Sequence, residues 1–122
     1  MKTTLITGGL GFIGSNICDA LLQKRYTNKC ILVDNFGGYM NPIKDSFTDF
    51  RKQRFPSLKN IIIERCDTSN YKALSSILNK YKPNYIYHTA ALPLAKVSNL
   101  NNEEAKISSV DSTVNIIDAI NL

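Results

Sequence analysis

Short apolar runs alternate along this chain with segments in which apolar residues recur at helical spacing. The runs predict four strands, at residues 3–7, 30–34, 61–64 and 85–89. The spacing predicts three helices, at residues 12–24, 70–81 and 103–122. Because continuous apolar strands that alternate with helices are buried on both faces, this order indicates a parallel sheet with helices on each side.

Apolar residues gather on one face of each outer helix. The first helix carries Ile13, Ile17, Ala20 and Leu21 on one face. The last helix carries a common stripe formed by Ile107, Val110, Val114 and Ile117. The middle helix begins beside Ser69 and Asn70, and either side chain suits the N-cap. Between the second and third strands we expect a loop at residues 36–42 and a helix at about residues 45–55.

The order of these elements predicts a single α/β domain. Crossovers between parallel strands are right-handed, which makes this a doubly wound, Rossmann-type sheet with strand order 3-2-1-4. With about four strands the sheet is incomplete, and we assign residues 1–122 to one dinucleotide-binding domain.

A glycine-rich turn joins the first strand to the first helix. It contains Gly8, Gly11 and Gly14, and the helix begins near Gly11. Glycine lets the backbone turn sharply and lets a phosphate approach without a Cβ in the way. The first amides of the helix lack intrahelical acceptors, and with the helix dipole they attract a pyrophosphate. Strand, turn and helix together predict a dinucleotide-phosphate site.

An acidic residue, Asp34, ends the second strand, about 20 positions after the glycine turn. There its carboxylate can accept hydrogen bonds from the hydroxyls of an adenosine ribose and would repel a 2′-phosphate. No arginine occurs at residues 35–39 to compensate, so NAD is favoured over NADP. The alternative, an aspartate that merely caps a turn, is less consistent with the neighbouring glycines.

Two further strand ends carry candidate residues. Asp67 follows the third strand, where it meets the adenine edge of a dinucleotide or caps the next helix, and one residue can do both. Ala90 and Ala91 follow the fourth strand, where small residues let the nicotinamide half pass closely. His88, the only histidine, has no nucleophile or ligand partner in the sequence, which favours a structural role.

The composition narrows the class of protein. Hydrophobic residues make up 43% of the chain, and no stretch approaches the roughly 20 apolar residues that span a bilayer. The N-terminal apolar run is interrupted by the glycine turn, unlike a signal peptide. Cys18, Cys30 and Cys66 have no metal-like spacing. We therefore expect no metal site, no membrane partner, free buried thiols and a cytoplasmic location.

The net charge of +5 is spread along the chain. Its densest basic stretch, Arg51-Lys-Gln-Arg54, lies near Asp45 and Asp49. No nucleic-acid-binding motif accompanies it, so a solvated face is favoured over a nucleic-acid surface.

Several of these motifs resemble those of the extended short-chain dehydrogenase/reductase family, specifically its NAD-dependent sugar-nucleotide epimerases and dehydratases. Thr7-Gly-Gly-Leu-Gly-Phe-Ile-Gly-Ser15 is similar to the family's TGGxGFIGS loop, and Val33-Asp-Asn35 to its VDN segment. His88-Thr-Ala-Ala91 resembles HxAA, and residues 110–119 resemble the helix written NVxGTxNLLEA. The resemblance adds Phe12, Ile13, Asn35 and Thr68 to the expected cofactor-binding residues.

Two departures bear on catalysis. Ser109 and Ser112 stand where the family has Asn and Gly in that helix, and without the Asn the polar contact that the resemblance implies there is not carried over. The resemblance also implies a catalytic tyrosine with a lysine four residues later, yet none of the six tyrosines has one. No residue of this chain is therefore assigned a catalytic role.

Three hypotheses for function follow. In the first, the chain is the N-terminal, NAD-binding portion of a sugar-nucleotide epimerase or dehydratase that works by transient hydride transfer to NAD. It then binds the cofactor without turnover, and a nucleotide sugar binds only with a C-terminal part. In the second, it is a stand-alone NAD-binding or regulatory module. In the third, it is an inactive subunit that assembles through its last helix, for example as a homodimer.

Overall fold

The computed structural model of the 122-residue chain describes residues 1–36, 55, 58–91 and 102–121. Four parallel strands form one sheet in the order β3-β2-β1-β4. They are β1 (Thr3–Thr7), β2 (Lys29–Asp34), β3 (Ile61–Arg65) and β4 (Tyr85–His88). The predicted doubly wound topology is confirmed, and the strand bounds agree with the prediction to within one residue at each end.

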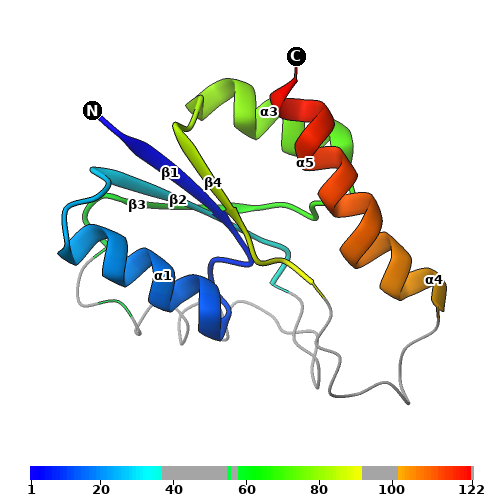
Figure 1. Ribbon diagram of the computed structural model, residues 1–122, viewed down its shortest axis with the longest axis horizontal. Coiled ribbons are helices and arrows are strands. Elements are labelled where there is room, and N and C mark those ends of the chain that lie inside the picture. Colours follow the sequence, from blue (N-terminus) through cyan, green and yellow to red (C-terminus); the bar gives the residue numbers. More distant parts are fainter. Residues whose placement is uncertain (37–54, 56–57, 92–101, 122) are drawn as a thin grey trace.

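Helices cover both faces of the sheet. Figure 1 shows α1 (Phe12–Gln23) on one face and α3 (Tyr71–Tyr81) beside α5 (Ser112–Ile120) on the other. Two short helical segments precede α5, namely α4 (Asn102–Ala105) and η2 (Lys106–Asp111). Because all four strands are parallel, their carboxyl ends meet at one edge of the sheet.

Alternate residues of the two central strands build two cores. Leu5 and Ile31 face α3 and α5, where they pack with Leu74 and Ile116. Ile6 and its β2 neighbour Leu32 face α1, where they pack with Cys18. The continuous apolar runs of β1 and β2 thus arise because both strands are buried on both faces.

Helix α3 begins at an asparagine cap. The side chain of Asn70 accepts a hydrogen bond from the backbone N–H of Ala73, at 3.1 Å. Of the two candidate caps, Asn70 is therefore the one used, and Ser69 precedes it. At the other end Lys82 takes a left-handed conformation, with φ of 44°, that closes the helix.

The apolar face predicted for α1 is only partly the buried one. Ile17 and Leu21 pack against the core, whereas Ile13 is 64% exposed and Ala20 is also exposed. The residues that α1 buries are Gly14, Ser15 and Cys18. Small side chains occupy the contact because this helix lies close against the glycine turn, so size decides its orientation as much as hydropathy does.

The last helix is not regular along its length. A π-helical segment, Lys106–Asp111, interrupts the α-helix expected over residues 103–122. Just beyond it, the hydroxyls of Ser112 and Thr113 each donate to the carbonyl four residues back, at 2.6 Å. Such bonds compete with the helical ladder, and the sequence pattern does not reveal them.

The loop and helix expected within residues 36–55 lie almost wholly outside the described residues. Phe55, which is described, is buried beside α1. Within the ranges that the structure describes, no helix is long and apolar enough to cross a membrane.

Candidate functional site

The glycine turn is held tightly at the end of β1. Gly8 has a φ of +65°, in the left-handed region that favours glycine, and its N–H donates to Val33 O at 2.7 Å. Its carbonyl accepts from Gly11 N at 3.0 Å. A Cβ on Gly8 would lie 2.9 Å from Ala90 N, so the turn also touches the segment that follows β4.

Gly14 provides the close approach of helix to turn. A Cβ at this position would lie 2.3 Å from Gly8 O and 2.9 Å from Gly9 Cα. Both neighbours are backbone atoms, which cannot swing aside as a flexible side chain can. The first turn of α1 therefore rests directly on the glycine turn, a close helix contact that only glycine permits.

The start of α1 is suited to an anion. Gly11 is the N-cap, and it supplies no side-chain hydrogen bond to the first amides of the helix. The side chains of Phe12 and Ile13 are 77% and 64% exposed, and their backbone N–H groups lie in the first turn of the helix. The first turn contains no acidic residue that would repel a phosphate.

Asp34 faces the glycine turn from the end of β2. Its side chain is buried, with Oδ2 accepting from Leu10 N at 3.1 Å and Oδ1 accepting from Phe36 N at 2.9 Å. The exposed Asn35 follows it. Each carboxylate oxygen thus accepts a backbone N–H group, and these two bonds fix the side chain beside the glycine turn.

The turn after β3 lies at the same edge of the sheet. Asp67 Oδ1 accepts from the backbone N–H and the hydroxyl of Ser69, at 2.9 and 2.8 Å. Thr68 is buried beside it. Because Asn70 caps α3, Asp67 instead stabilises the turn before the helix, and the cap alternative for Asp67 is wrong.

Asn115 on α5 braces this turn, and the sequence analysis missed it. Its side-chain amide donates to the carbonyls of Thr68 and Ser69, each at 3.0 Å. The only sequence signal for Asn115 was that this polar residue stands next to Ile116. Ile116 is buried on the face of α5 that points toward the sheet. The contact bridges 47 residues of sequence in one case and 46 in the other, which no local pattern reveals.

The segment after β4 is anchored to β1 by a second residue that the sequence analysis missed, Thr7. Its hydroxyl accepts from Thr89 N at 3.1 Å and Ala90 N at 3.2 Å, and its carbonyl accepts from the Thr89 hydroxyl at 2.6 Å. Ala90 is therefore held beside the glycine turn, and the exposed Ala91 follows it.

The expected cofactor-binding residues thus gather at one edge of the sheet. The glycine turn, Asp34, the turn at Asp67 and the segment at Ala90 follow β1, β2, β3 and β4 in turn. Figure 1 shows the ends of β1 and β4 meeting beside the start of α1. In an open parallel sheet, ligands bind outside these carboxyl ends, where the strand order reverses. Here that reversal lies between β1 and β4.

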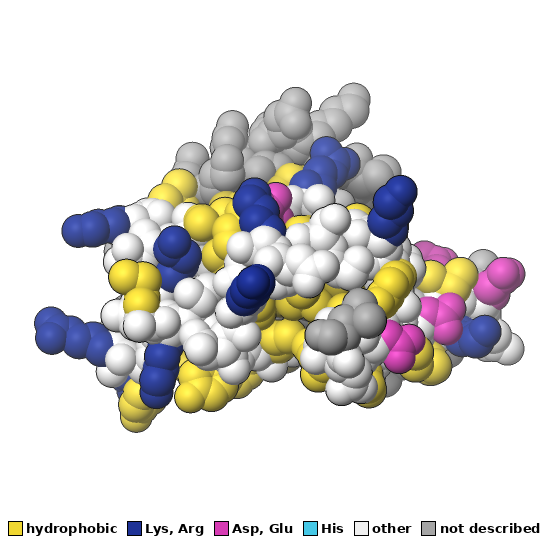
Figure 2. All heavy atoms as spheres, turned by 90° about the horizontal axis from the view of Figure 1, so that it is seen from above, with side chains coloured by type: hydrophobic (Ala, Val, Ile, Leu, Met, Phe, Trp, Pro, Cys, Tyr) yellow, Lys and Arg dark blue, Asp and Glu magenta, His cyan; other side chains and the backbone are white. Residues whose placement is uncertain are grey.

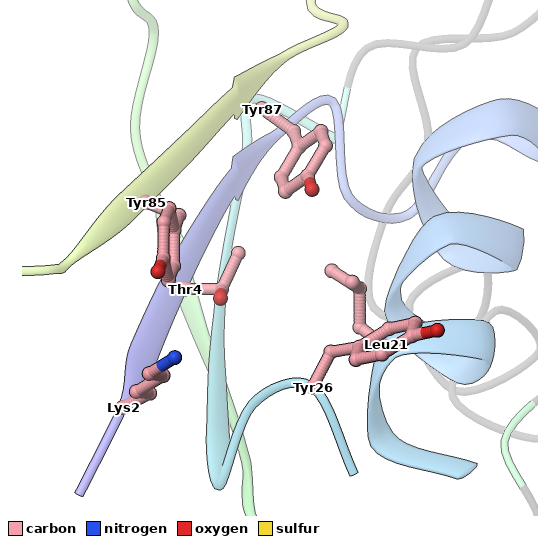
Figure 3. Close-up of a pocket in the computed structure, with 6 residues that line it drawn as sticks. All are labelled: Lys2, Thr4, Leu21, Tyr26, Tyr85 and Tyr87. Atoms are coloured by element: carbon pink, nitrogen blue, oxygen red, sulfur yellow. The ribbon is translucent and has the colours of Figure 1, made fainter. Parts of the chain in front are cut away.

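A separate cavity opens at the other end of the sheet. It has a volume of about 190 Å³ and lies between α1, β1 and β4. Figure 3 shows its lining residues, which are Lys2, Thr4, Leu21, Tyr26, Tyr85 and Tyr87. Because Lys2, Thr4 and Tyr85 stand at the amino ends of the strands, this cavity is distinct from the edge that carries the glycine turn.

In the described part of the chain, neither the surface charges nor the metal-binding side chains indicate a second binding site. Figure 2 shows Lys and Arg side chains scattered over the face seen there, with acidic side chains toward the end that carries α4. The basic stretch Arg51-Lys-Gln-Arg54 lies outside the described residues. Among those that are described, no group of three or more His, Cys, Asp or Glu residues gathers to hold a metal.

Comparison with known proteins matches one family model and several longer relatives. Residues 5–122 match the family model described as GDP-mannose 4,6 dehydratase. The chain is 30% identical over 123 aligned residues to a probable polysaccharide biosynthesis protein, EpsC, of Bacillus subtilis, covering 99% of this chain and 19% of that protein. It is 32% identical over 90 residues to UDP-glucose 4-epimerase of Caenorhabditis elegans, covering 72% of this chain and 25% of the relative.

Solved structures share the fold. UDP-glucose 4-epimerase of Stenotrophomonas maltophila, with bound NAD and formylated UDP-arabinopyranose, superposes with a TM-score of 0.78 at 18% identity. The match covers 99% of this chain and 34% of that one. UDP-glucose 4-epimerase of Bifidobacterium longum, in complex with NAD⁺ and UDP, also gives 0.78, at 21% identity, with 98% and 33% covered. The chain thus spans about a third of these structures' length.

Proposed function

Because this chain belongs to the GDP-mannose 4,6-dehydratase family, we propose that it is the NAD-binding part of a sugar-nucleotide epimerase or dehydratase. One observation carries the proposal. The glycine turn, the uncapped start of α1 and the buried carboxylate of Asp34 converge at the carboxyl edge of the sheet. The related structures named above contain NAD, which supports the choice of cofactor.

We assign each part of the edge to one part of the dinucleotide. The pyrophosphate lies against the glycine turn and the first amides of α1, and the adenosine ribose lies against Asp34 and Asn35. The adenine lies beside Asp67 and Thr68. The nicotinamide half lies beside Ala90 and Ala91. The cofactor-binding residues in this proposal are Gly8, Gly11, Phe12, Ile13, Gly14, Asp34, Asn35, Asp67, Thr68, Ala90 and Ala91.

In this proposal the cofactor supplies the hydride chemistry. NAD, when bound, accepts a hydride from a sugar carbon, and the protein supplies binding and orientation. The tyrosine and lysine pair that the resemblance implies does not occur in these 122 residues. We therefore propose that this chain binds NAD without turnover. Reaction of a nucleotide sugar then requires sequence that the relatives carry beyond the matched part.

Titration calorimetry of the 122-residue chain with NAD and with NADP tests this function. We expect saturable 1:1 binding of NAD at least about tenfold tighter than that of NADP, a difference of roughly 1.4 kcal/mol. The reason is that the Asp34 carboxylate accepts ribose hydroxyls and repels a 2′-phosphate. Equal affinity for both cofactors, or no binding of either, would contradict the proposal. Conversion of UDP-glucose by this chain alone would contradict the part on turnover.

We also propose that the chain pairs with a second copy through its last helix, which η2 and α5 form together. Ile107, Val110, Val114 and Ile117 form the predicted stripe, and all four are exposed, by 39% to 54%. Val114 and Ile117 stand three residues apart on α5, so they share one face of that helix. Ile107 and Val110 precede them in the π-helical segment η2. The sheet-facing side of α5 is formed instead by Ser112 and Ile116.

Substituting the centre of this stripe tests the pairing. Val114→Glu should convert a dimer into a monomer, because pairing would bury two like charges in an apolar seam. Sedimentation velocity measures the change. Asn79→Glu, which adds the same charge at an exposed position on α3, should leave the dimer intact. A wild-type chain that sediments as a monomer at high concentration, or a dimer that survives Val114→Glu, would overturn this proposal.

A cytoplasmic location and the absence of a nucleic-acid partner complete the proposal. Cys18, Cys30 and Cys66 are free and buried, as is usual for thiols in a reducing compartment. The scattered basic side chains in Figure 2 support a solvated surface.

A further inference from the structure

The ring of His88 joins two walls of the proposed cofactor site to helix α5. Its Nδ1 lies 2.6 Å from the Thr7 hydroxyl at the end of β1. Its Nε2 lies 3.3 Å from the hydroxyl of Ser112 and 3.2 Å from that of Thr113, both on α5. Both ring nitrogens therefore have hydroxyl partners, and these partners decide which nitrogen carries the proton.

In the contact between Thr7 and Nδ1 of His88, the shared hydrogen is on the Thr7 hydroxyl. The Thr7 hydroxyl oxygen already accepts from two backbone N–H groups, that of Ala90 and that of Thr89, which is shared with the Thr7 carbonyl at 3.2 Å. A hydroxyl oxygen has two lone pairs and one hydrogen, so the remaining interaction of Thr7 is as a donor. It donates to Nδ1 of His88, which must then be unprotonated.

In the contacts between Nε2 of His88 and the hydroxyls of α5, the hydrogen is on the ring nitrogen. The Ser112 hydroxyl donates to Ser108 O, and the Thr113 hydroxyl donates to Ser109 O, each at 2.6 Å. With their hydrogens so used, both hydroxyl oxygens act only as acceptors toward the ring. Nε2 of His88 therefore carries the hydrogen.

We propose that His88 is a positioning residue for the dinucleotide, held as the neutral Nε2–H tautomer so that it fixes the Thr89–Ala90 segment against the glycine turn. This inference rests on the proposed function and adds a residue that the assignment of cofactor contacts does not contain. His88 acts through Thr7, whose hydroxyl connects the ring to the backbone of Thr89 and Ala90.

This network sets how closely the Thr89–Ala90 segment approaches Gly8. The backbone nitrogen of Ala90 and the hydroxyl of Thr89 would each lie 2.9 Å from a Cβ on Gly8. The segment after β4 therefore forms one wall, and the glycine turn forms the other. Loss of the bond between His88 and Thr7 loosens the hold of the Thr7 hydroxyl on Thr89 and Ala90, although the Thr7 carbonyl still accepts from Thr89, and it widens the place assigned to the nicotinamide half.

Protonation of the ring breaks this arrangement. A hydrogen on Nδ1 would point at the Thr7 oxygen, whose two lone pairs are occupied, and would leave the Thr7 hydrogen without an acceptor. The groups that face the ring from β1 and α5 are the uncharged hydroxyls of Thr7, Ser112 and Thr113. Among the described residues none of its contacts is a carboxylate that would favour the cation, and burial lowers the pKa of His88 from the usual 6.5.

The sign of the pH effect follows from this lowered pKa. Below pH 6.5 the unfolded chain takes up a proton that the folded chain resists. His88 therefore contributes stability above that pH, and the contribution is lost as the pH falls through the lowered pKa of the folded state. Cofactor affinity should fall over the same acidic range, because the protonated ring no longer accepts from Thr7.

Calorimetric titration with NAD between about pH 5 and pH 8 tests the inference. We expect the wild-type chain to lose affinity about tenfold toward the acidic limit, a typical size for coupling between two sites. His88→Asn places an amide oxygen where Nδ1 accepts and cannot be protonated, so it should bind nearly as well as wild type at pH 8 and resist acid. His88→Leu should bind about tenfold more weakly at every pH. Tyr87→Phe, at the neighbouring position of β4, should behave as wild type.

The titration separates the two proposals. If the wild-type chain does not bind NAD at pH 8, the proposed function fails. If it binds NAD and His88→Asn loses affinity on acidification just as wild type does, the positioning role of His88 is wrong and the proposed function stands.

A second measurement needs neither a variant nor NAD. His88 is the only histidine, so long-range ¹H–¹⁵N spectra of the chain report on it without assignment. At pH 8 we expect the pattern of the Nε2–H tautomer, and a titration midpoint below 6.5. The Nδ1–H tautomer, or a midpoint above 6.5, would overturn the inference.

Discussion

Replacing Gly14 with alanine should abolish NAD binding and destabilise the fold by about 1–3 kcal/mol, the usual cost of overpacking a close contact. The added Cβ would lie 2.3 Å from Gly8 O. That oxygen also accepts from Gly11 N, so moving it disturbs the hydrogen bond that shapes the turn. We expect at least about a hundredfold loss of NAD affinity, roughly 2.7 kcal/mol, because the turn and the first amides of α1 move apart.

Thermal unfolding followed by circular dichroism measures the stability, and calorimetry at a temperature below the transition measures the affinity. Gly11→Ala is the matched control for stability. Its Cβ would lie 3.2 Å from Gly8 O, and Gly11 has a φ of −76°, which any residue adopts. We expect it to unfold within a few degrees of wild type. Normal NAD binding by Gly14→Ala would contradict the role given to the glycine turn.

Replacing Asp34 with asparagine should reduce the preference for NAD over NADP by about tenfold or more, equivalent to roughly 1.4 kcal/mol. The amide keeps the size of the side chain and one oxygen acceptor, for example toward Leu10 N or Phe36 N. It removes the negative charge that would repel a 2′-phosphate, and it replaces one of the two carboxylate oxygens by an amide group that donates. We expect NAD affinity to fall and NADP affinity to rise or stay constant.

Titration of the variant with each cofactor gives the ratio of the two dissociation constants. Asp19→Asn is the matched control, since it removes the same charge from α1, where Asp19 accepts a hydrogen bond from Gln23 rather than from the glycine turn. It should leave the ratio unchanged. A ratio that stays at the wild-type value in Asp34→Asn would show that Asp34 does not contact the ribose.

The sheet could be predicted from the sequence because its strands are short, apolar and separated by turn residues. β1 and β2 are buried on both faces, and such strands produce continuous apolar runs that fix their type and their parallel pairing. The glycine turn could be predicted because its chemistry is local. Gly8, Gly11 and Gly14 lie within seven residues of the chain, and Gly8 and Gly14 have backbone reasons, a positive φ and a close contact.

The contacts that complete the site could not be predicted, because they join distant parts of the sequence. Thr7 meets His88 across 81 residues, and Asn115 meets Thr68 across 47. The orientation of α1 was also only partly predictable. Its packing is decided by how closely Gly14 approaches Gly8, a steric contact that a hydropathy pattern does not contain.

The central claim is that NAD binds at the carboxyl edge of the sheet, over the glycine turn. Mapping backbone amide chemical shifts of the 122-residue chain as NAD is added tests it most directly. The largest shifts should fall on Gly11, Phe12, Ile13 and Gly14, with further shifts at Ala90 and Ala91. Shifts confined to the other end of the sheet, around the cavity at Tyr85 and Tyr87, or no shifts at saturating NAD, would contradict the claim.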